Sequence, residues 1–212
     1  MIRILIVDDH ILIREGLKKI LLATDDIEIV GELGEGEEVI GFLKDTYCDL
    51  VILDVNLPDI NGLDVLKKIK AAESGIRVLM LSIFPEEHFA VRAIRAGAMG
   101  YLTKDSAPGE LIGAIRKIMS GNRYITETLA ESLAEVVDSN LDDDTHKILS
   151  DREFQVLLAI GRGLSLREIS DELELSQSTV HTYKNRILKK LKLDSAAHLI
   201  RYVISHNLSD QN

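Results

Sequence analysis

The chain has 212 residues and carries 25 Lys and Arg against 35 Asp and Glu, a formal net charge of −10. This length suits one large domain or two small ones, and the hydrophobic and charged fractions, 46% and 28%, are those of a soluble globular protein. No apolar run reaches the roughly 18 residues that would cross a bilayer, and the single cysteine, Cys48, excludes an internal disulfide. A cytoplasmic protein without a membrane partner is therefore expected.

Short apolar runs alternate with helical patterns through residues 1–122. Segments with helical periodicity separate the runs, and each run is apolar enough for a strand that is covered on both faces. The predicted strands are Arg3–Val7, Ile27–Leu33, Leu50–Asp54, Arg77–Leu81 and Met99–Leu102. Five strand–helix units in one stretch predict a doubly wound α/β domain with a five-stranded parallel sheet. In such a domain, functional groups gather at the carboxyl ends of the strands.

Residues 123–147 are predicted to link this domain to a second one. Thr126–Val137 has the pattern of a connecting helix, whereas Asp138–Lys147 contains four Asp and no apolar periodicity. A segment with so little to bury is typical of a flexible linker.

Strand patterns end after the linker, and residues 148–212 predict four short helices. Two Ser-x-x-Glu sequences, which begin at Ser150 and Ser165, have the spacing of capping boxes, in which side chains satisfy free backbone N–H groups at a helix start. The second and third helices are separated only by a tight connection near Glu174. This arrangement predicts a small all-α domain with a helix-turn-helix module.

Five polar residues follow the ends of the predicted strands. Asp8 and Asp9 follow the first strand, Asp54 ends the third, Ser82 follows the fourth, and Lys104 lies just past the fifth. Because the carboxyl ends of parallel strands lie side by side, these residues are expected to converge. Three crowded carboxylates repel one another, and Mg²⁺ prefers such oxygen ligands together with a phosphate. The set therefore predicts a magnesium site at which an aspartate carries a phosphoryl group.

Each of these residues also has an ordinary structural interpretation. Asp8 or Asp9 alone suits a helix N-cap, Asp54 alone suits a loop carboxylate, and Ser82 or Lys104 alone indicates nothing. Only the placement of all five at the same edge of one sheet favours the phosphoacceptor interpretation.

Residues 1 to about 122 resemble the flavodoxin-like receiver domain of bacterial two-component response regulators. The resemblance rests on Asp8-Asp9, Asp54-Val55-Asn56-Leu57-Pro58 with Gly62, Leu81-Ser82 and Gly100-Tyr101-Leu102-Thr103-Lys104. It implies that Asp54 accepts a phosphoryl group from a histidine kinase. Lys104 would pair with that group, Ser82 would donate a hydrogen bond to it, and Tyr101 would be the switch aromatic that turns inward as Ser82 moves.

The same resemblance implies a ligand set for Mg²⁺. Asp9, Asp54 and the backbone carbonyl of Asn56 would hold the cation, and Asp8 would reach it through water.

The segment Ser176–Leu193 contains five Lys and Arg and no acid. Val180, Tyr183, Ile187 and Leu191 recur at helical spacing and predict an inward stripe, which leaves polar and basic residues on the other side. On composition alone, a solvated surface helix is the simpler interpretation. As the second helix of a helix-turn-helix, however, this face suits the major groove. The candidate DNA-binding residues are His181, Thr182, Lys184, Asn185, Arg186 and Lys189.

Residues 148–204 resemble the effector domain of NarL/FixJ (LuxR-type) regulators. The matching residues are Leu149-Ser150-Asp151-Arg152-Glu153, Val156-Leu157, Gly163, Glu168-Ile169, Leu173, Leu175-Ser176, Thr179-Val180 and Lys190-Leu191. The resemblance implies that Ser176–Leu193 recognises DNA and that the last helix, Ser195–His206, helps to pair two effector domains. Position 181 is commonly Lys in this family and is His here, while position 183 is often His and is Tyr here.

Together these observations predict a DNA-binding transcriptional regulator that is controlled by phosphorylation of Asp54. Its partners would be a sensor histidine kinase, double-stranded promoter DNA and a second copy of the chain when phosphorylated or DNA-bound, with RNA polymerase as a further candidate. It would catalyse only its own phosphorylation and dephosphorylation. One alternative is a phosphorylation-independent regulator whose receiver serves for dimerisation or docking. Another is an aspartyl-phosphate phosphatase, which usually needs a second acid where this chain has Asn56.

Overall fold

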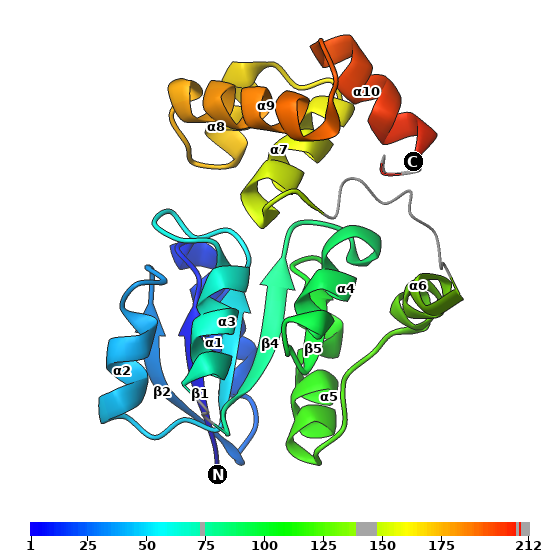
Figure 1. Cartoon of the computed structure of the whole chain (residues 1–212). Helices are drawn as coiled ribbons and strands as arrows, with labels where there is room; N and C mark the ends of the chain where they lie inside the picture. Colours follow the sequence, from blue (N-terminus) through cyan, green and yellow to red (C-terminus); the bar gives the residue numbers. More distant parts are fainter. Residues whose placement is uncertain (73–74, 139–147, 207, 209–212) are drawn as a thin grey trace. The chain divides into compact units, whose positions relative to one another are not determined.

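The chain folds into two units, Met1–Asp138 and Ser139–Asn212. The structure, a computed structural model, describes residues 1–72, 75–138, 148–206 and 208 (Figure 1). Within these residues, no helix combines the length and the apolar character needed to cross a membrane.

A five-stranded, all-parallel sheet forms the centre of the first unit, with the strand order β2-β1-β3-β4-β5. The strands are β1 (Ile2–Val7), β2 (Ile27–Leu33), β3 (Leu50–Asp54), β4 (Arg77–Ser82) and β5 (Gly100–Thr103). All five residues of β3 are buried, as expected for the middle strand of a sheet that is covered on both faces. The predicted strands therefore exist, and their ends agree with the structure to within one residue.

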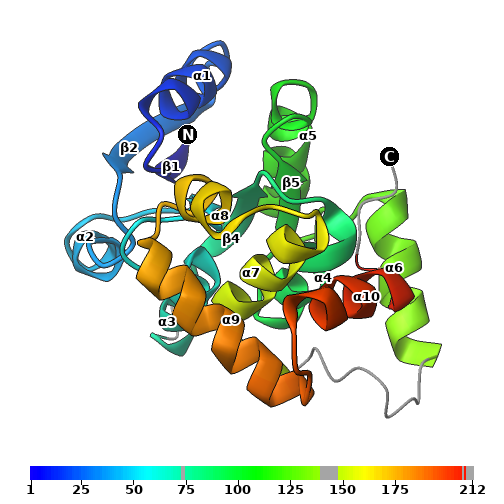
Figure 2. The same ribbon diagram turned by 90° about the horizontal axis from the view of Figure 1, so that it is seen from above.

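Helices cover both faces of this sheet. They are α1 (Ile11–Leu21), α2 (Val39–Asp45), α3 (Gly62–Ala71), α4 (Glu86–Arg95) and α5 (Ala107–Met119). The view in Figure 2 shows α1 and α5 on one side of the sheet and α2, α3 and α4 on the other. The core between the sheet and α5 is made of aliphatic residues such as Ile6, Ile52, Leu81 and Ile115, all buried. This confirms the doubly wound α/β prediction.

The chain continues along the open edge of β5 before it forms another helix. Gly100 and Tyr124 make a parallel β-bridge, in which the Tyr124 amide donates to the Met99 carbonyl at 2.8 Å. The helix α6 (Glu127–Asp138) follows and packs against α4. The structure thus groups with the first unit a helix that the sequence assigns to the linker, while residues 139–147 of the predicted acidic linker lie outside the described residues.

Four helices are described in the second unit. They are α7 (Asp151–Gly161), α8 (Leu166–Glu172), α9 (Gln177–Leu191) and α10 (Ala196–Ser205). Both predicted capping boxes are present, because Ser150 exchanges hydrogen bonds with Glu153 and Ser165 does so with Glu168. The α8–α9 turn places Glu174 at a left-handed φ of 52°. Together these features confirm the helix-turn-helix.

The helix α9 ends two residues earlier than the sequence predicts. Lys192 adopts a left-handed conformation with φ 55°, so the chain turns there instead of continuing to Leu193.

Candidate phosphoacceptor site and DNA-binding helix

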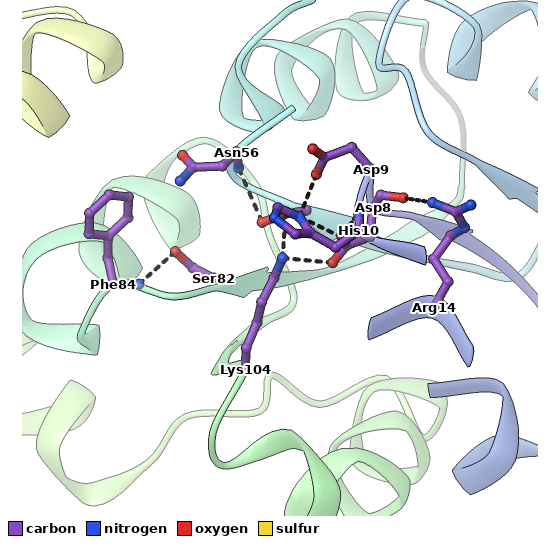
Figure 3. Close-up of polar contacts among 9 residues, drawn as sticks. Asp8, Asp9, His10, Arg14, Asn56, Ser82, Phe84 and Lys104 are labelled. Atoms are coloured by element: carbon purple, nitrogen blue, oxygen red, sulfur yellow. Dashed lines mark hydrogen bonds and ion pairs between the residues drawn. The ribbon is translucent and has the colours of Figure 1, made fainter. Parts of the chain in front are cut away.

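The predicted acidic cluster forms at the carboxyl edge of the sheet. The Lys104 Nζ lies 2.7 Å from an Asp54 Oδ2 oxygen and 2.8 Å from an Asp8 Oδ2 oxygen, so one ammonium bridges the ends of β1 and β3 (Figure 3). Both carboxylates are only 1% exposed. The loop that carries Lys104 is held to β4, because its amide donates to the Ser82 carbonyl at 2.7 Å. Residues that are 96 positions apart in the chain thus meet, as the sheet topology predicts.

The loop after β3 fixes the Asp54 carboxylate. Its Oδ1 atom accepts a hydrogen bond from the Asn56 amide at 3.1 Å, while Lys104 holds Oδ2. The loop folds back tightly, since the Gly62 amide donates to the Val55 carbonyl and a Cβ at position 62 would lie 1.9 Å from the Asp54 carbonyl oxygen. Only glycine fits at this position, which explains its place in the motif.

Burial dominates the electrostatics of this pocket. It raises the pKa of Asp54 to about 7, with Lys104 opposing the rise and the Asp8 carboxylate adding to it. Burial by itself would lower the pKa of Lys104, but the Asp54 and Asp8 carboxylates outweigh that effect and raise it. Burial thus holds the pKa of Asp54 above the usual range of a carboxyl group, and added positive charge would favour its ionised form.

The donor set at this edge suits a hard divalent cation. Ligand atoms of Asp8, Asp9, His10 and Asp54 all lie within 4.8 Å of one another. Asp8 and Asp54 share the ammonium of Lys104, and Asp9 adds a third carboxylate to the cluster, so the site has an excess of negative charge that Mg²⁺ would neutralise. Asp8 Oδ1 accepts the His10 amide at 2.8 Å, and Asp8 Oδ2 lies 2.8 Å from the Lys104 ammonium.

His10 belongs to this cluster but was not predicted from the sequence as a site residue. Its Nδ1 atom lies 2.8 Å from Asp9 Oδ1 and 3.4 Å from Asp8 Oδ1, so the ring contacts the candidate cation ligands (Figure 3). Its position next to Asp8 and Asp9 in the chain was the available signal.

Ser82 and Tyr101 are both fully buried and converge on one residue, Phe84. The Ser82 hydroxyl accepts the Phe84 amide at 3.0 Å, and the Tyr101 hydroxyl donates to the Phe84 carbonyl at 2.8 Å. The Tyr101 ring thus already occupies the inward position that the resemblance assigns to the switch aromatic. In this structure the described contact of the Ser82 hydroxyl is with Phe84 and not with Asp54.

A chain of contacts leads from Phe84 to α6. The Phe84 ring stacks on Phe89 of α4 with ring centroids 4.8 Å apart. Glu86, at the first turn of α4, accepts a hydrogen bond from the Thr126 hydroxyl, which also accepts the Leu129 amide at the start of α6. The carboxyl edge of the sheet is therefore connected to the last described helix before the second unit.

The helix α9 has the two faces that the sequence predicts. Val180, Ile187 and Leu191 are buried, and Tyr183 is half-buried. The exposed members of the predicted DNA-binding set are His181, Thr182, Asn185, Arg186 and Lys189, whereas Lys184 is only half-exposed on the flank. The structure thus brings five of the six candidates to the exposed surface of one helix.

Two of these side chains are oriented by neighbours on the same helix. Asn185 Nδ2 lies 3.3 Å from His181 Nδ1, and the Thr182 hydroxyl donates to the Ser178 carbonyl at 2.9 Å.

Lys190 makes a structural contact that was not predicted from the sequence. Its Nζ lies 2.6 Å from Glu153 Oε2 and 3.2 Å from the Ile148 carbonyl, so it holds α9 against the start of α7. The Glu153 side chain is 3% exposed; although burial opposes it, hydrogen bonds from Lys190 and Ser150 lower its pKa. The capping box at the start of α7 and the helix α9 are therefore joined through one carboxylate.

A parallel sheet with an Asp–Lys pocket at its carboxyl edge, followed by a helix-turn-helix unit, defines a class of signalling proteins in which a phosphoacceptor domain governs DNA binding. Residues 4–116 match the response regulator receiver domain, and residues 147–203 match the LuxR family of bacterial regulatory proteins. The chain belongs to the two-component response regulators of the NarL/FixJ (LuxR-type) family, which are phosphorylation-dependent transcriptional regulators.

Relatives with the same two-domain arrangement cover the whole chain. Response regulator UvrY of Escherichia coli K12 is 35% identical over 98% of this chain and 96% of its own length. Response regulator GacA of Pseudomonas aeruginosa is 35% identical over 99% of both chains. The crystal structure of response regulator ChrA, from a haem-sensing two-component system, is 31% identical, covers 98% of both chains and gives a TM-score of 0.52.

Proposed function

We propose that Asp54 accepts a phosphoryl group from a sensor histidine kinase and that this event controls the binding of α9 to double-stranded promoter DNA. The observation that carries the proposal is the Lys104 ammonium, which lies 2.7 Å from Asp54 and 2.8 Å from Asp8 in a buried pocket. A carboxylate held between two fixed donors at the edge of a sheet is positioned to act as a nucleophile.

Each pocket residue has a distinct role in the proposed phosphoryl transfer. An Asp54 oxygen forms the new O–P bond as the P–N bond of a phosphohistidine donor breaks, and the released imidazole takes up a proton. The Asn56 amide and Lys104 hold the two Asp54 oxygens before the transfer. Lys104 then pairs with the phosphoryl oxygens, and the Ser82 hydroxyl donates to one of them. Positioning and charge neutralisation account for most of the catalysis.

The acidic donor set fits Mg²⁺. Asp9, Asp54 and the backbone carbonyl of Asn56 would hold the cation, and Asp8, which accepts the His10 amide and pairs with Lys104, would reach it through water. The cation supplies the positive charge that keeps Asp54 ionised and that offsets the incoming phosphoryl group.

The second unit supplies the output. The exposed face of α9 enters the major groove, where cationic side chains contact phosphates and shorter polar ones reach the bases. In α10, Leu199 and Val203 are buried while Ile204 is 58% exposed, which supports pairing with a second copy of the chain through this helix. We also propose RNA polymerase as a further partner and, because these proposed partners act there, the cytoplasm as the location of the protein.

One experiment tests the phosphoacceptor. The full-length protein is incubated with acetyl phosphate, with and without MgCl₂, and its intact mass is followed. We expect a single phosphoryl addition that requires Mg²⁺ and is lost in Asp54→Asn. Asp105→Asn, which removes an exposed acid beside Lys104, serves as the matched control and should be labelled like the wild type.

Two outcomes would contradict the proposal. Labelling that persists in Asp54→Asn would mean that another aspartate is the acceptor. DNA binding that is the same with and without the label would favour the phosphorylation-independent regulator.

We further propose that the protein turns over only its own phosphoryl group, so steady release of phosphate from added phosphomonoesters would instead favour a phosphatase.

A further inference from the structure

The exposed face of α9 carries a hydrogen-bonded pair of side chains one helical turn apart. Asn185 Nδ2 lies 3.3 Å from His181 Nδ1, and both residues are exposed. Packing does not require either side chain, because Val180 and Ile187 bury the opposite side of the helix. The pair lies where bases would be contacted and includes position 181, at which this chain has His in place of the common Lys.

The hydrogen bond determines which donors and acceptors of His181 and Asn185 remain available for contacts with bases. An amide nitrogen only donates, so Nδ1 of His181 must be the acceptor, and the neutral ring then carries its hydrogen on Nε2. The outer end of His181 is therefore a single donor. Asn185 keeps its second N–H and its carbonyl oxygen, which form a donor and an acceptor side by side.

These groups match particular bases in the major groove. Guanine presents two acceptors there, O6 and N7, and adenine presents the N6 donor beside the N7 acceptor, which is the pattern that an Asn amide contacts with two hydrogen bonds. One helical turn advances about 5.4 Å, and base pairs repeat about every 3.4 Å along the duplex. Because His181 and Asn185 are hydrogen-bonded to each other at 3.3 Å, their remaining donors and acceptors lie close enough together to reach neighbouring base pairs.

We propose that His181 and Asn185 act as one coupled pair that selects a guanine next to an adenine in each half-site. Coupling arises because each side chain orients the other: the amide fixes the ring tautomer, and the ring fixes the amide direction. Thr182, another exposed residue of this helix, donates its hydroxyl to the Ser178 carbonyl at 2.9 Å instead of to this pair. The Arg186 guanidinium lies 5.9 Å from the Tyr183 ring centroid, on the flank of the helix.

The test is a selection of bound duplexes from a randomised pool, using full-length protein treated with acetyl phosphate. Wild type should enrich adjacent guanine and adenine positions. Asn185→Ala should lose the adenine preference and also weaken the guanine preference, and His181→Ala should do the reverse. Each loss should lower affinity for the selected duplex by roughly 5- to 150-fold. Lys189→Gln, the matched control on the same face, should weaken binding to all sequences alike and leave the base preferences intact.

Affinities of the two single variants and of the His181→Ala/Asn185→Ala double variant then measure the coupling. For a coupled pair, the loss in the double variant is smaller than the product of the single losses. Multiplicative losses, with each variant changing only its own base position, would overturn the inference. The inference rests on the proposed entry of α9 into the major groove. If α9 does not enter the groove, Lys189→Gln should leave the affinity for DNA unchanged, and neither His181→Ala nor Asn185→Ala should change any base preference. This result differs from the multiplicative losses that would overturn the coupling alone.

Discussion

The ionised form of Asp54 is energetically unfavourable in its buried pocket, although the proposed phosphoryl transfer requires it. The carboxylate is 1% exposed and shares one ammonium with Asp8. Burial of a partly compensated charge is unfavourable, and the pKa of Asp54, about 7, expresses that cost. Positive charge in the pocket would lower this cost, so the proposed binding of Mg²⁺ would favour the ionised carboxylate that accepts the phosphoryl group.

The raised pKa predicts the effect of Asp54→Asn on stability. Because the folded pKa lies above the usual value of 3.8, the stabilising contribution of protonated Asp54 is complete below about pH 4 and is lost as the pH rises through 7. Asn cannot ionise, so the variant should unfold with a larger free energy than wild type above pH 7. The effect of Lys104 is already contained in that pKa, so the gain should be on the order of a few kcal/mol, because each pH unit between the unfolded and the folded pKa contributes about 1.4 kcal/mol.

Urea unfolding followed by circular dichroism, in the presence of a chelator and between pH 4.5 and 8, measures this difference. The gain should shrink toward pH 4.5 and should also shrink on addition of MgCl₂, which stabilises only the wild type. A stability difference that does not change with pH would contradict the assigned cause.

The convergence of side chains at the strand ends could be predicted from the sequence, whereas their individual contacts in the loops and between helices could not. The convergence of Asp8, Asp54 and Lys104 follows from one topological rule, that parallel strands end at the same edge. The contact of the Ser82 hydroxyl with the Phe84 amide, in contrast, depends on the shape of the loop after β4, which the strand pattern does not specify. The basic run of α9 likewise does not reveal that Lys190 pairs with Glu153, which is 37 residues away.

Among the elements, α6 is the one whose role changed most between sequence and structure. The periodicity of residues 126–137 predicts a helix correctly but does not say which surface it covers. The structure shows that it packs on α4, after the preceding segment has extended the sheet beyond β5. Thr126 begins this helix and donates to Glu86 of α4. A rearrangement at the start of α4 would therefore act on α6 directly.

Thr126→Val tests this connection, because valine has nearly the same shape without the hydroxyl. Loss of the Glu86 contact and of the cap on Leu129 should cost the start of α6 about 1 kcal/mol. Hydrogen exchange at Leu129 and Ala130 should become faster, and the increase in DNA affinity on phosphorylation should become smaller. Thr126→Ser, which keeps the hydroxyl, is the control. Unchanged exchange in Thr126→Val would show that packing on α4 alone holds the helix.

At the scale of the whole molecule, the charge is divided unevenly along the chain. Residues 1–122 contain 14 Lys and Arg against 20 Asp and Glu, residues 123–147 contain 2 against 7, and residues 148–212 contain 9 against 8. Ser176–Leu193 alone carries five cations and no acid. A phosphoryl group on Asp54 replaces a single carboxylate charge by about −2. Electrostatics alone would therefore make the phosphorylated protein bind DNA more weakly, and we attribute any gain in affinity to the proposed pairing of chains.

Pairing predicts a change in the salt dependence of DNA binding. Each phosphate contact contributes about −0.9 to the slope of the logarithm of the association constant against the logarithm of salt concentration, so two α9 helices on one duplex should give about twice the slope of one. Fluorescence anisotropy with a labelled promoter duplex, with and without acetyl phosphate, measures both slopes. Lys189→Gln should make each slope shallower by about 0.9 for every chain bound. Equal slopes in the two states would show that the same number of chains binds without phosphorylation, as expected for a phosphorylation-independent regulator.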